Sequence, residues 1–361
     1  MVVQNPQSHK PIRGRGASWS PANRFERLHV DLTDPDIVDV SCESEERLRR
    51  QTQYFRDATR TIITRNTSPD VGFETSLNPY RGCEHGCIYC YARPTHEYLG
   101  FSAGLDFETK IMIKTNAPEL LRAELESPRW QPQVLVLSGV TDPYQPVERQ
   151  LRITRGCLEV LATFRNPVAI ITKNHLVTRD IDVLRQLAAY DAAAVNISVT
   201  SLDPKLQRVL EPRTTSPRGR LDAIRQLRGA NIPVGVMVAP VIPGLTDHEL
   251  PNILDACAKA GAQFAGYTIV RLPWAVAPLF EHWLEEQFPD RKEKVLGRLR
   301  SMRRNRLNNS QWHKRMTGEG IFADQIASLF KVSCHRSGIG RRPTLSCESF
   351  CRSTMQLRLL V

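Results

Sequence analysis

From Phe73 onward, short apolar runs of strand length alternate with longer stretches in which apolar residues recur at helical spacing. The short runs are rich in β-branched residues and are bounded by Pro, Gly or Asp, which is typical of strands buried on both faces of a parallel sheet. Five such strands are predicted, at Val134–Val140, Val168–Thr172, Val195–Thr200, Val234–Val241 and Phe264–Val270.

Amphipathic helices are predicted between these strands, at Arg152–Phe164, Ile181–Tyr190, Arg218–Arg228 and Asp247–Lys259. Repeated strand–helix units indicate a parallel α/β fold. One further strand before Cys83 brings the expected number of strands to six. Ile111–Lys114, followed by a helix at Glu119–Glu126, is either another unit or an insertion.

Polar residues recur where the predicted strands end, at Asp142, Lys173, Thr200 and Pro243–Gly244. Loops at the carboxyl ends of barrel strands build the functional site in α/β barrels. The sequence contains neither GxGxxG nor GxxxxGK[ST], which disfavours a Rossmann or P-loop protein. We therefore predict an α/β fold of the partial (β/α)6 barrel type.

The pattern divides the chain into a predicted N-terminal extension (1–72), a barrel core (73–275) and a helical, basic C-terminal region (276–361). Gly and Pro interrupt the start of the extension, spaced acids follow at 31–36, and Glu43–Arg50 is expected to form a short charged helix. Near the other end, Arg291–Arg315 contains ten Lys or Arg residues and one Glu. That stretch is either a solvated helix face or a phosphate-binding surface.

The chain has 361 residues, of which 41% are hydrophobic, so it can bury a sizeable core. No apolar run approaches the roughly 20 residues needed to cross a bilayer, and Met1–Lys10 lacks the apolar segment of a secretory signal. We therefore expect a cytoplasmic protein without membrane contact, whose nine cysteines are free thiols or ligands. A net charge of +11 and a pI near 9.4 suit phosphate-rich partners such as nucleic acid, although they also suit plain solubility.

Three cysteines, Cys83, Cys87 and Cys90, lie within eight positions, with Gly82 and Gly86 among them. The glycines permit a tight backbone that turns the thiols toward one place. Soft thiolates select zinc, copper(I) or an iron–sulfur cluster.

Zinc is the structural alternative, but a structural zinc site normally has four protein ligands. No fourth ligand is obvious, since His85 lies awkwardly between two of the cysteines. A 4Fe–4S cluster usually takes four cysteines, so three would leave one iron open to a substrate or cofactor.

The spacing C-x3-C-x-aromatic-C, with Tyr89 as the aromatic residue, resembles the signature of the radical S-adenosylmethionine (SAM) superfamily. The surrounding residues, from Leu77 to Arg93, resemble more narrowly a bacterial family related to spore photoproduct lyase. Further segments are similar to that family, at Arg13–Ala17, Thr141–Glu148, Ile171–Lys173, Glu211–Arg213, Ala239–Gly244 and Arg315–Gly320.

The resemblance implies two cofactors. Cys83, Cys87 and Cys90 would hold a 4Fe–4S cluster, whose fourth iron chelates the amino and carboxylate groups of SAM. An electron from the reduced cluster, delivered by an external flavodoxin or ferredoxin type of donor, would break the bond from sulfur to the 5′ carbon. The resulting 5′-deoxyadenosyl radical would abstract hydrogen from a substrate, while the protein orients the cofactor and excludes competing reactions.

The resemblance also implies contacts to SAM at the strand ends. Tyr89 is expected to pack near the adenine, and Lys173 to pair with the cofactor carboxylate. Ser198 and Thr200 share one face of a strand, and either is expected to donate a hydrogen bond to the carboxylate or the ribose.

Two more candidates lie nearby. Arg213 is expected to bind a carboxylate, because its guanidinium forks onto such groups. Asp142 is expected to accept a hydrogen bond from ribose or substrate, unless it only opens a turn before Pro143.

One departure from the family limits the analogy. Spore photoproduct lyase uses a cysteine just after its second barrel strand to return hydrogen to the product, and Leu137–Asp142 contains no cysteine. Cys157 lies a helix away and is expected to pack within that helix. An auxiliary cluster is a further hypothesis for the remaining cysteines near the C-terminus, at Cys334, Cys347 and Cys351.

The leading hypothesis is an enzyme that cleaves SAM reductively and acts on nucleic acid as a lyase-like repair or modification enzyme. A second enzymatic hypothesis has a peptide or small-molecule substrate. The alternative from another class is a non-catalytic iron–sulfur redox sensor or nucleic-acid-binding module. An open iron and polar strand ends favour catalysis, because a sensor needs neither.

Overall fold

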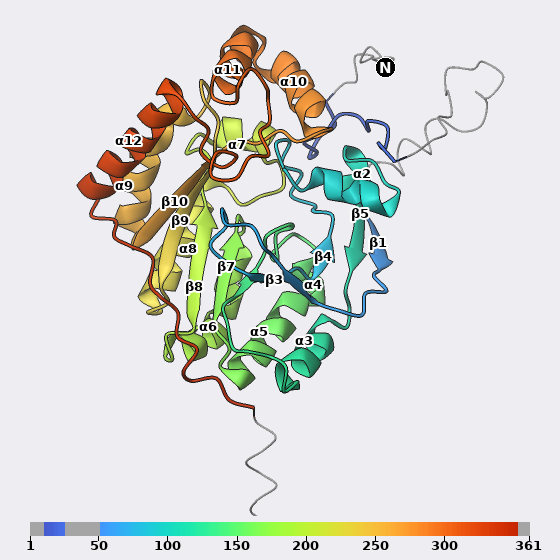
Figure 1. Ribbon diagram of the computed structural model, residues 1–361, viewed down its shortest axis with the longest axis vertical. Helices are drawn as coiled ribbons and strands as arrows, with labels where there is room; N and C mark the ends of the chain where they lie inside the picture. The colour runs from blue at the N-terminus through green and yellow to red at the C-terminus, as the bar shows by residue number, and fades with distance from the viewer. Residues whose placement is uncertain (1–10, 26–50, 353–361) are drawn as a thin grey trace, which may run out of the picture.

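The computed structural model describes residues 11–25 and 51–352, and its main feature is a seven-stranded sheet (Figure 1). Six parallel strands lie side by side in the order in which they occur along the chain, and an antiparallel strand adds to the first of them. This order is that of a barrel rather than a doubly wound sheet, so the predicted partial (β/α)6 barrel is confirmed. The seven strands are β2 (Ile63–Arg65), β3 (Thr75–Leu77), β6 (Leu135–Leu137), β7 (Val168–Thr172), β8 (Ala193–Ser198), β9 (Val234–Val241) and β10 (Phe264–Ile269).

The predicted bounds of β7 and β9 are confirmed, whereas β6 ends three residues earlier than expected. Ser138 and Gly139 follow β6 with φ of 139° and 104°, a backbone conformation that a strand cannot continue. The chain therefore leaves the sheet there and starts the loop that carries Asp142.

Helices pack on the outer face of the barrel and bury their apolar stripes against the sheet. In α5 this stripe includes Cys157, Leu158 and Leu161, all fully buried. Two of these helices, α4 and α7, were not predicted, and α7 ends just before Glu211. The helices between strands are α3 (Ala117–Glu126), α4 (Glu148–Leu151), α5 (Ile153–Phe164), α6 (Ile181–Ala188), α7 (Pro204–Leu210), α8 (Pro217–Gly229) and α9 (Leu250–Ala260).

A second, three-stranded sheet shows that Ile111–Lys114 belongs to an insertion rather than to a barrel unit. Its strands are β1 (Gln53–Arg56), β5 (Lys110–Ile113) and β4 (Tyr80–Arg81). Between β4 and β5 the chain forms the cysteine loop, a 3₁₀ helix η1 (Arg93–Leu99) and α2 (Leu105–Thr109). The predicted helix at Glu43–Arg50 and the acids at 31–36 lie outside the described residues.

The C-terminal region is helical, as predicted, with α10 (Val276–Gln287), α11 (Pro289–Ser301) and α12 (Ile321–Arg336). Figure 1 shows α10 and α11 at the upper end and α12 beside α9. One basic residue here is structural: buried Arg303 donates to the carbonyl oxygens of Val270 at 2.7 Å and Arg315 at 3.1 Å. Over 11–25 and 51–352, no helix combines the length and apolar character needed to traverse a bilayer.

Strands β9 and β10 approach closely where Gly235 pairs with Phe264. A Cβ added at Gly235 would lie 2.3 Å from the Phe264 ring and 2.7 Å from its carbonyl oxygen. We predict that Gly235→Ala lowers the free energy of unfolding by about 1–3 kcal/mol, because the strands must move apart. Urea denaturation followed by circular dichroism measures this change.

The matched control is Gly229→Ala at the end of α8, where an added Cβ meets nothing within 4 Å. This change should leave stability unchanged or raise it by about 0.4–1 kcal/mol through the unfolded chain. Equal unfolding midpoints for the two variants would contradict the close approach of β9 and β10.

Candidate functional site

The cysteine loop follows β4 and turns at two glycines. Gly82 and Gly86 have φ of 78° and 67°, so both occupy the left-handed region that favours glycine. A Cβ at Gly86 would lie 2.8 Å from the Glu108 carboxylate, so the loop also needs glycine for space. Cys83 and Cys87 are buried, and Cys90 is half-buried.

The thiols lie close enough to affect one another's ionisation. Burial raises the pKa of Cys90 to about 11, and the neighbouring Cys83 adds to the effect. Burial likewise raises the pKa of Cys87. Thiolates in this loop therefore need positive charge beside them, which iron ions supply.

Within the described ranges, no three His, Cys, Asp or Glu side chains are placed to hold a single metal ion. A cuboidal cluster binds its thiolates on separate iron atoms, so its ligands do not converge on one point. The chemistry and burial of the three thiols thus fit a 4Fe–4S cluster with one iron left open.

One side of the loop is fixed by a buried ion pair. Arg93 donates to the carbonyl oxygen of Cys87 through Nε at 3.0 Å and Nη2 at 2.9 Å, and Nη2 lies 2.5 Å from Glu108 Oε1. The Glu108 carboxylate also accepts from the backbone N–H groups of Gly16 at 3.0 Å and Ala17 at 2.9 Å. These contacts hold the N-terminal segment around Gly16 against the cysteine loop.

The other side of the loop contacts the segment Thr141–Glu148 after β6. Asp142 Oδ2 lies 3.4 Å from His85 Nδ1, and Gln145 Oε1 accepts from the backbone N–H of Glu84 at 2.9 Å. Farther along, Glu148 accepts from the Tyr80 hydroxyl at 2.5 Å. This segment therefore positions the loop backbone at several points.

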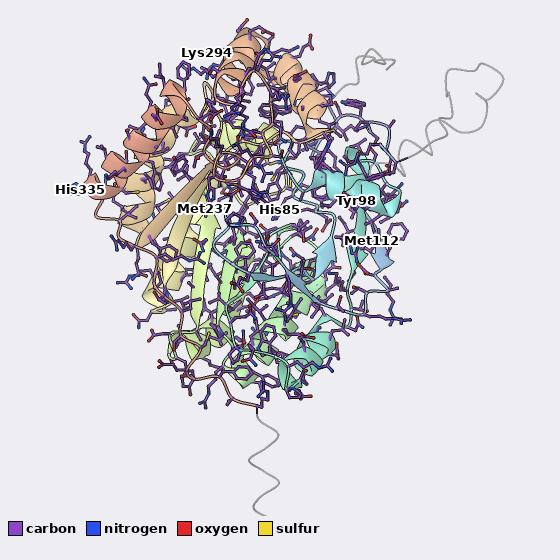
Figure 2. All side chains as sticks on the ribbon, viewed as in Figure 1. His85, Tyr98, Met112, Met237, Lys294 and His335 are labelled. Carbon is purple, nitrogen blue, oxygen red and sulfur yellow. The ribbon has the colours of Figure 1, made fainter. Side chains whose placement is uncertain are left out.

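Asp142 is fully engaged by these and other partners. Its carboxylate accepts from Thr172 Oγ1 at 2.7 Å and the Lys173 backbone N–H at 2.7 Å. Burial opposes protonation of His85, but Asp142 and Cys83 raise the pKa of His85 to about 10. His85 thus faces Asp142 in the middle of the molecule (Figure 2).

Three of the predicted SAM contacts gather around one carboxylate, that of Glu211 after α7. Tyr89 and Thr200 donate hydrogen bonds to Glu211 Oε1, the latter at 2.6 Å, and Lys173 Nζ lies 3.2 Å from the same oxygen. Lys173 also donates to the Ala239 carbonyl oxygen of β9 at 2.9 Å. The group therefore joins the cysteine loop to the ends of β7, β8 and β9.

Glu211 remains charged although it is buried. Burial opposes its ionisation, but Arg220 and Lys173 hold the pKa of Glu211 well below its usual range. Arg220, itself buried, pairs with Glu211 and donates to the Ser198 carbonyl oxygen at 2.9 Å. The sequence interpretation included Glu211 in a family segment but did not assign it a role.

The remaining predicted contacts lie elsewhere. Ser198 is buried and contributes its backbone carbonyl to Arg220. Arg213 lies on the outer side of the cysteine loop, where Nη1 is 3.4 Å from Glu84 and 3.3 Å from Thr52 Oγ1. The structure therefore does not bring Arg213 to the group around Glu211.

The described cysteines outside the loop are free thiols. Cys157 is buried in α5, as expected, and Cys257 is buried in α9. Cys351 packs against the end of α5, where its backbone N–H donates to the Phe164 carbonyl oxygen at 3.0 Å. In the part of the chain that the structure describes, Cys334, Cys347 and Cys351 are not placed to hold a single metal ion, and the auxiliary cluster stays a hypothesis.

Comparison with known proteins identifies the class. Residues 77–257, half of the chain, match the model of the Radical SAM superfamily, and the chain belongs to that superfamily. It is similar to an uncharacterized protein of Mycobacterium tuberculosis, with 39% identity over 222 residues that cover 60% of this chain and 65% of that protein. The match thus spans less than two thirds of this relative.

Two further similarities concern named proteins. A radical SAM Nα-GlyT isomerase of Pseudomonas phage M6 is 26% identical over 220 residues, which cover 60% of this chain and 44% of that protein. Spore photoproduct lyase complexed with dinucleoside spore photoproduct has the same fold, with a TM-score of 0.57 and 16% identity over 81% of this chain and 83% of that chain.

The predicted recognition, fold and cofactors are thereby confirmed. The chain is a radical SAM protein related in fold to spore photoproduct lyase, and its cofactors are a 4Fe–4S cluster and SAM. Membership in this superfamily supports an iron–sulfur enzyme.

The Arg93–Glu108 pair generates a prediction for cluster loading. Glu108→Gln leaves the Arg93 charge buried without a counter-charge, so we expect a loss of about 3–5 kcal/mol in unfolding free energy. Without Glu108 to hold it, Arg93 no longer fixes the carbonyl oxygen of Cys87. Iron bound per chain after anaerobic reconstitution should therefore fall as well.

Glu124→Gln on the exposed face of α3 makes the same chemical change and should alter neither the free energy of unfolding nor the iron bound per chain. If Glu108→Gln retained wild-type iron and wild-type stability, the ion pair would not fix the loop.

Proposed function

We propose that Cys83, Cys87 and Cys90 ligate the cluster, that SAM binds beside them, and that the enzyme acts on nucleic acid as a lyase-like repair or modification enzyme. The observation that carries the SAM site is the group of Tyr89 and Lys173 around Glu211. This group lies at the carboxyl ends of barrel strands and contacts the cysteine loop directly through Tyr89.

Each side chain around Glu211 contacts a different part of SAM. Lys173 pairs with the SAM carboxylate, and the ring of Tyr89 packs near the adenine. Thr200 gives its one hydroxyl proton to Glu211, so toward SAM it accepts a hydrogen bond from a ribose hydroxyl rather than donating one. Glu211 acts as a positioning residue, because it holds all three side chains through one oxygen. Held by these residues, the two cofactors would supply the radical chemistry: one electron from an external donor, passed through the cluster to SAM, would release methionine and a 5′-deoxyadenosyl radical able to take hydrogen from the substrate.

The other candidates have supporting roles in this proposal. Asp142 fixes the end of β7 and the ring of His85 rather than binding ribose, since both its oxygens already have partners. Ser198 anchors Arg220, and through it Glu211. Arg213 steadies Glu84 at the outer side of the cysteine loop.

Two observations support a nucleic-acid substrate. The chain carries a net charge of +11, which favours a polyanionic partner. Its fold aligns with 83% of the chain of a spore photoproduct lyase that was solved in complex with a dinucleoside spore photoproduct. The loop after β6 has no cysteine, so hydrogen return to the product uses another group than in that lyase.

Catalysis is tested by anaerobic reconstitution, dithionite reduction and chromatography for 5′-deoxyadenosine. We expect the wild type to release 5′-deoxyadenosine, and Cys87→Ala to lose both the brown cluster absorbance and the product. Cys334→Ala removes a half-buried thiol outside the loop and should retain both.

An unchanged iron content in Cys87→Ala would contradict the assignment of Cys87 as a cluster ligand. A wild-type cluster that never yields 5′-deoxyadenosine would favour the redox-sensor alternative instead.

The substrate class is tested by equilibrium binding of a fluorescently labelled DNA strand and an RNA strand at several salt concentrations. Because phosphate contacts release counterions, we expect the association constant to fall steeply and linearly on logarithmic axes as salt rises. Binding that is absent or independent of salt would instead favour a peptide or small-molecule substrate.

A further inference from the structure

A cavity of about 510 Å³ lies outside the SAM site, between α11, α12 and the loop after β9. Figure 2 shows Lys294 of α11 at the upper end of the molecule, away from the central His85. The polar and charged residues that line the cavity are Asp247, His248, Arg291, Lys294, Arg298 and Gln325.

One wall of the cavity is cationic. Arg291, Lys294 and Arg298 are spaced three and four residues apart, so they lie on one face of α11. Arg298 pairs with Asp247 at 2.8 Å, and Asp247 is the one acidic residue of the lining. Arg291 and Lys294 have no ion-pair partner among the residues that the structure describes.

Most other cations of the basic stretch have ion-pair partners or are buried. Arg304 and Lys314 pair with Glu319, and Arg315 pairs with Asp70 at 2.5 Å. Arg303 is buried and bonded to backbone carbonyls. Much of the stretch is therefore structural, and the two cations of α11 without an ion pair in the described part of the chain, Arg291 and Lys294, both line the cavity.

The opposite wall is apolar. Phe322, Ile326 and Leu329 lie on one face of α12, and Phe322 and Leu329 are each 37% exposed. The Arg298 guanidinium lies 5.2 Å from the centre of the Phe322 ring. A flat apolar group can therefore rest on this wall while its anionic part faces α11.

We propose that this cavity binds a nucleotide, with its phosphate on Arg291 and Lys294 and its base against Phe322. Unpaired cations make strong charge-assisted hydrogen bonds to phosphate. The cavity binds the nucleotide either free in solution or as one unit of a nucleic-acid strand. The assignment goes beyond the proposed function, because it needs neither the cluster nor SAM.

The test uses the cluster-loaded protein without reductant or SAM, titrated with thymidine monophosphate and with a labelled short oligothymidylate. Lys294→Glu and Arg291→Glu should each weaken binding at least tenfold, about 1.4 kcal/mol. Lys331→Glu makes the same charge change at an exposed position of α12 outside the lining, and it should change binding less than twofold, about 0.4 kcal/mol.

The Phe322→Ala variant tests the apolar wall independently of the cationic wall. It should weaken binding of thymidine monophosphate while leaving binding of inorganic phosphate unchanged, because phosphate has no base to rest on the ring. Loss of only the oligothymidylate in the α11 variants identifies a strand contact, and loss of only the monophosphate identifies a free-nucleotide site.

The assignment is overturned if neither probe binds, if Lys294→Glu has no effect, or if Lys331→Glu weakens binding as much as Lys294→Glu. The last result would show diffuse attraction by the whole basic surface. A failure of 5′-deoxyadenosine release would contradict the proposed function and leave this titration unaffected.

Discussion

The ion pair between Arg93 and Glu108 is fully buried, and the cysteine loop depends on it. Two charges removed from water are costly unless each finds charged and hydrogen-bonding partners. Arg93 finds them in Glu108 and in the carbonyl oxygen of Cys87, while Glu108 also binds the backbone of Gly16. The same contacts therefore close the N-terminal segment over the loop and fix the position of the second thiol.

A second buried carboxylate, Glu211, connects the loop to the barrel strands. Glu211 holds Lys173 and Tyr89 where strands β7 to β9 end, and Arg220 balances its charge. Satisfied polar networks of this kind are rigid, because each unpaired member would be costly. A rigid group at the ends of the barrel strands suits the proposed SAM site, which must orient the cofactor and keep a reactive radical from water.

The sequence predicted the parts of the molecule that depend on local pattern. The bounds of β7 and β9 follow from apolar runs rich in β-branched residues, and the tight turns of the cysteine loop follow from Gly82 and Gly86. The sequence did not show whether Ile111–Lys114 forms a barrel strand, because its pairing with β1 and β4 depends on tertiary contacts.

The functional network was harder to predict for the same reason. Tyr89 and Glu211 are 122 positions apart, and Glu108 is 92 positions from Gly16. No periodicity connects such residues. A buried Glu or Arg is also indistinguishable in sequence from an exposed one, so Glu108 and Glu211 received no role.

The central claim is that three cysteines leave one iron of the cluster open to SAM, beside the cradle around Glu211. Electron paramagnetic resonance of the reduced cluster tests it most directly. SAM bound at the open iron should change the g values of the reduced wild-type protein, and Lys173→Met should need more SAM to give the same change. A spectrum that stays unchanged at saturating SAM, in protein with a full complement of iron, would contradict the account.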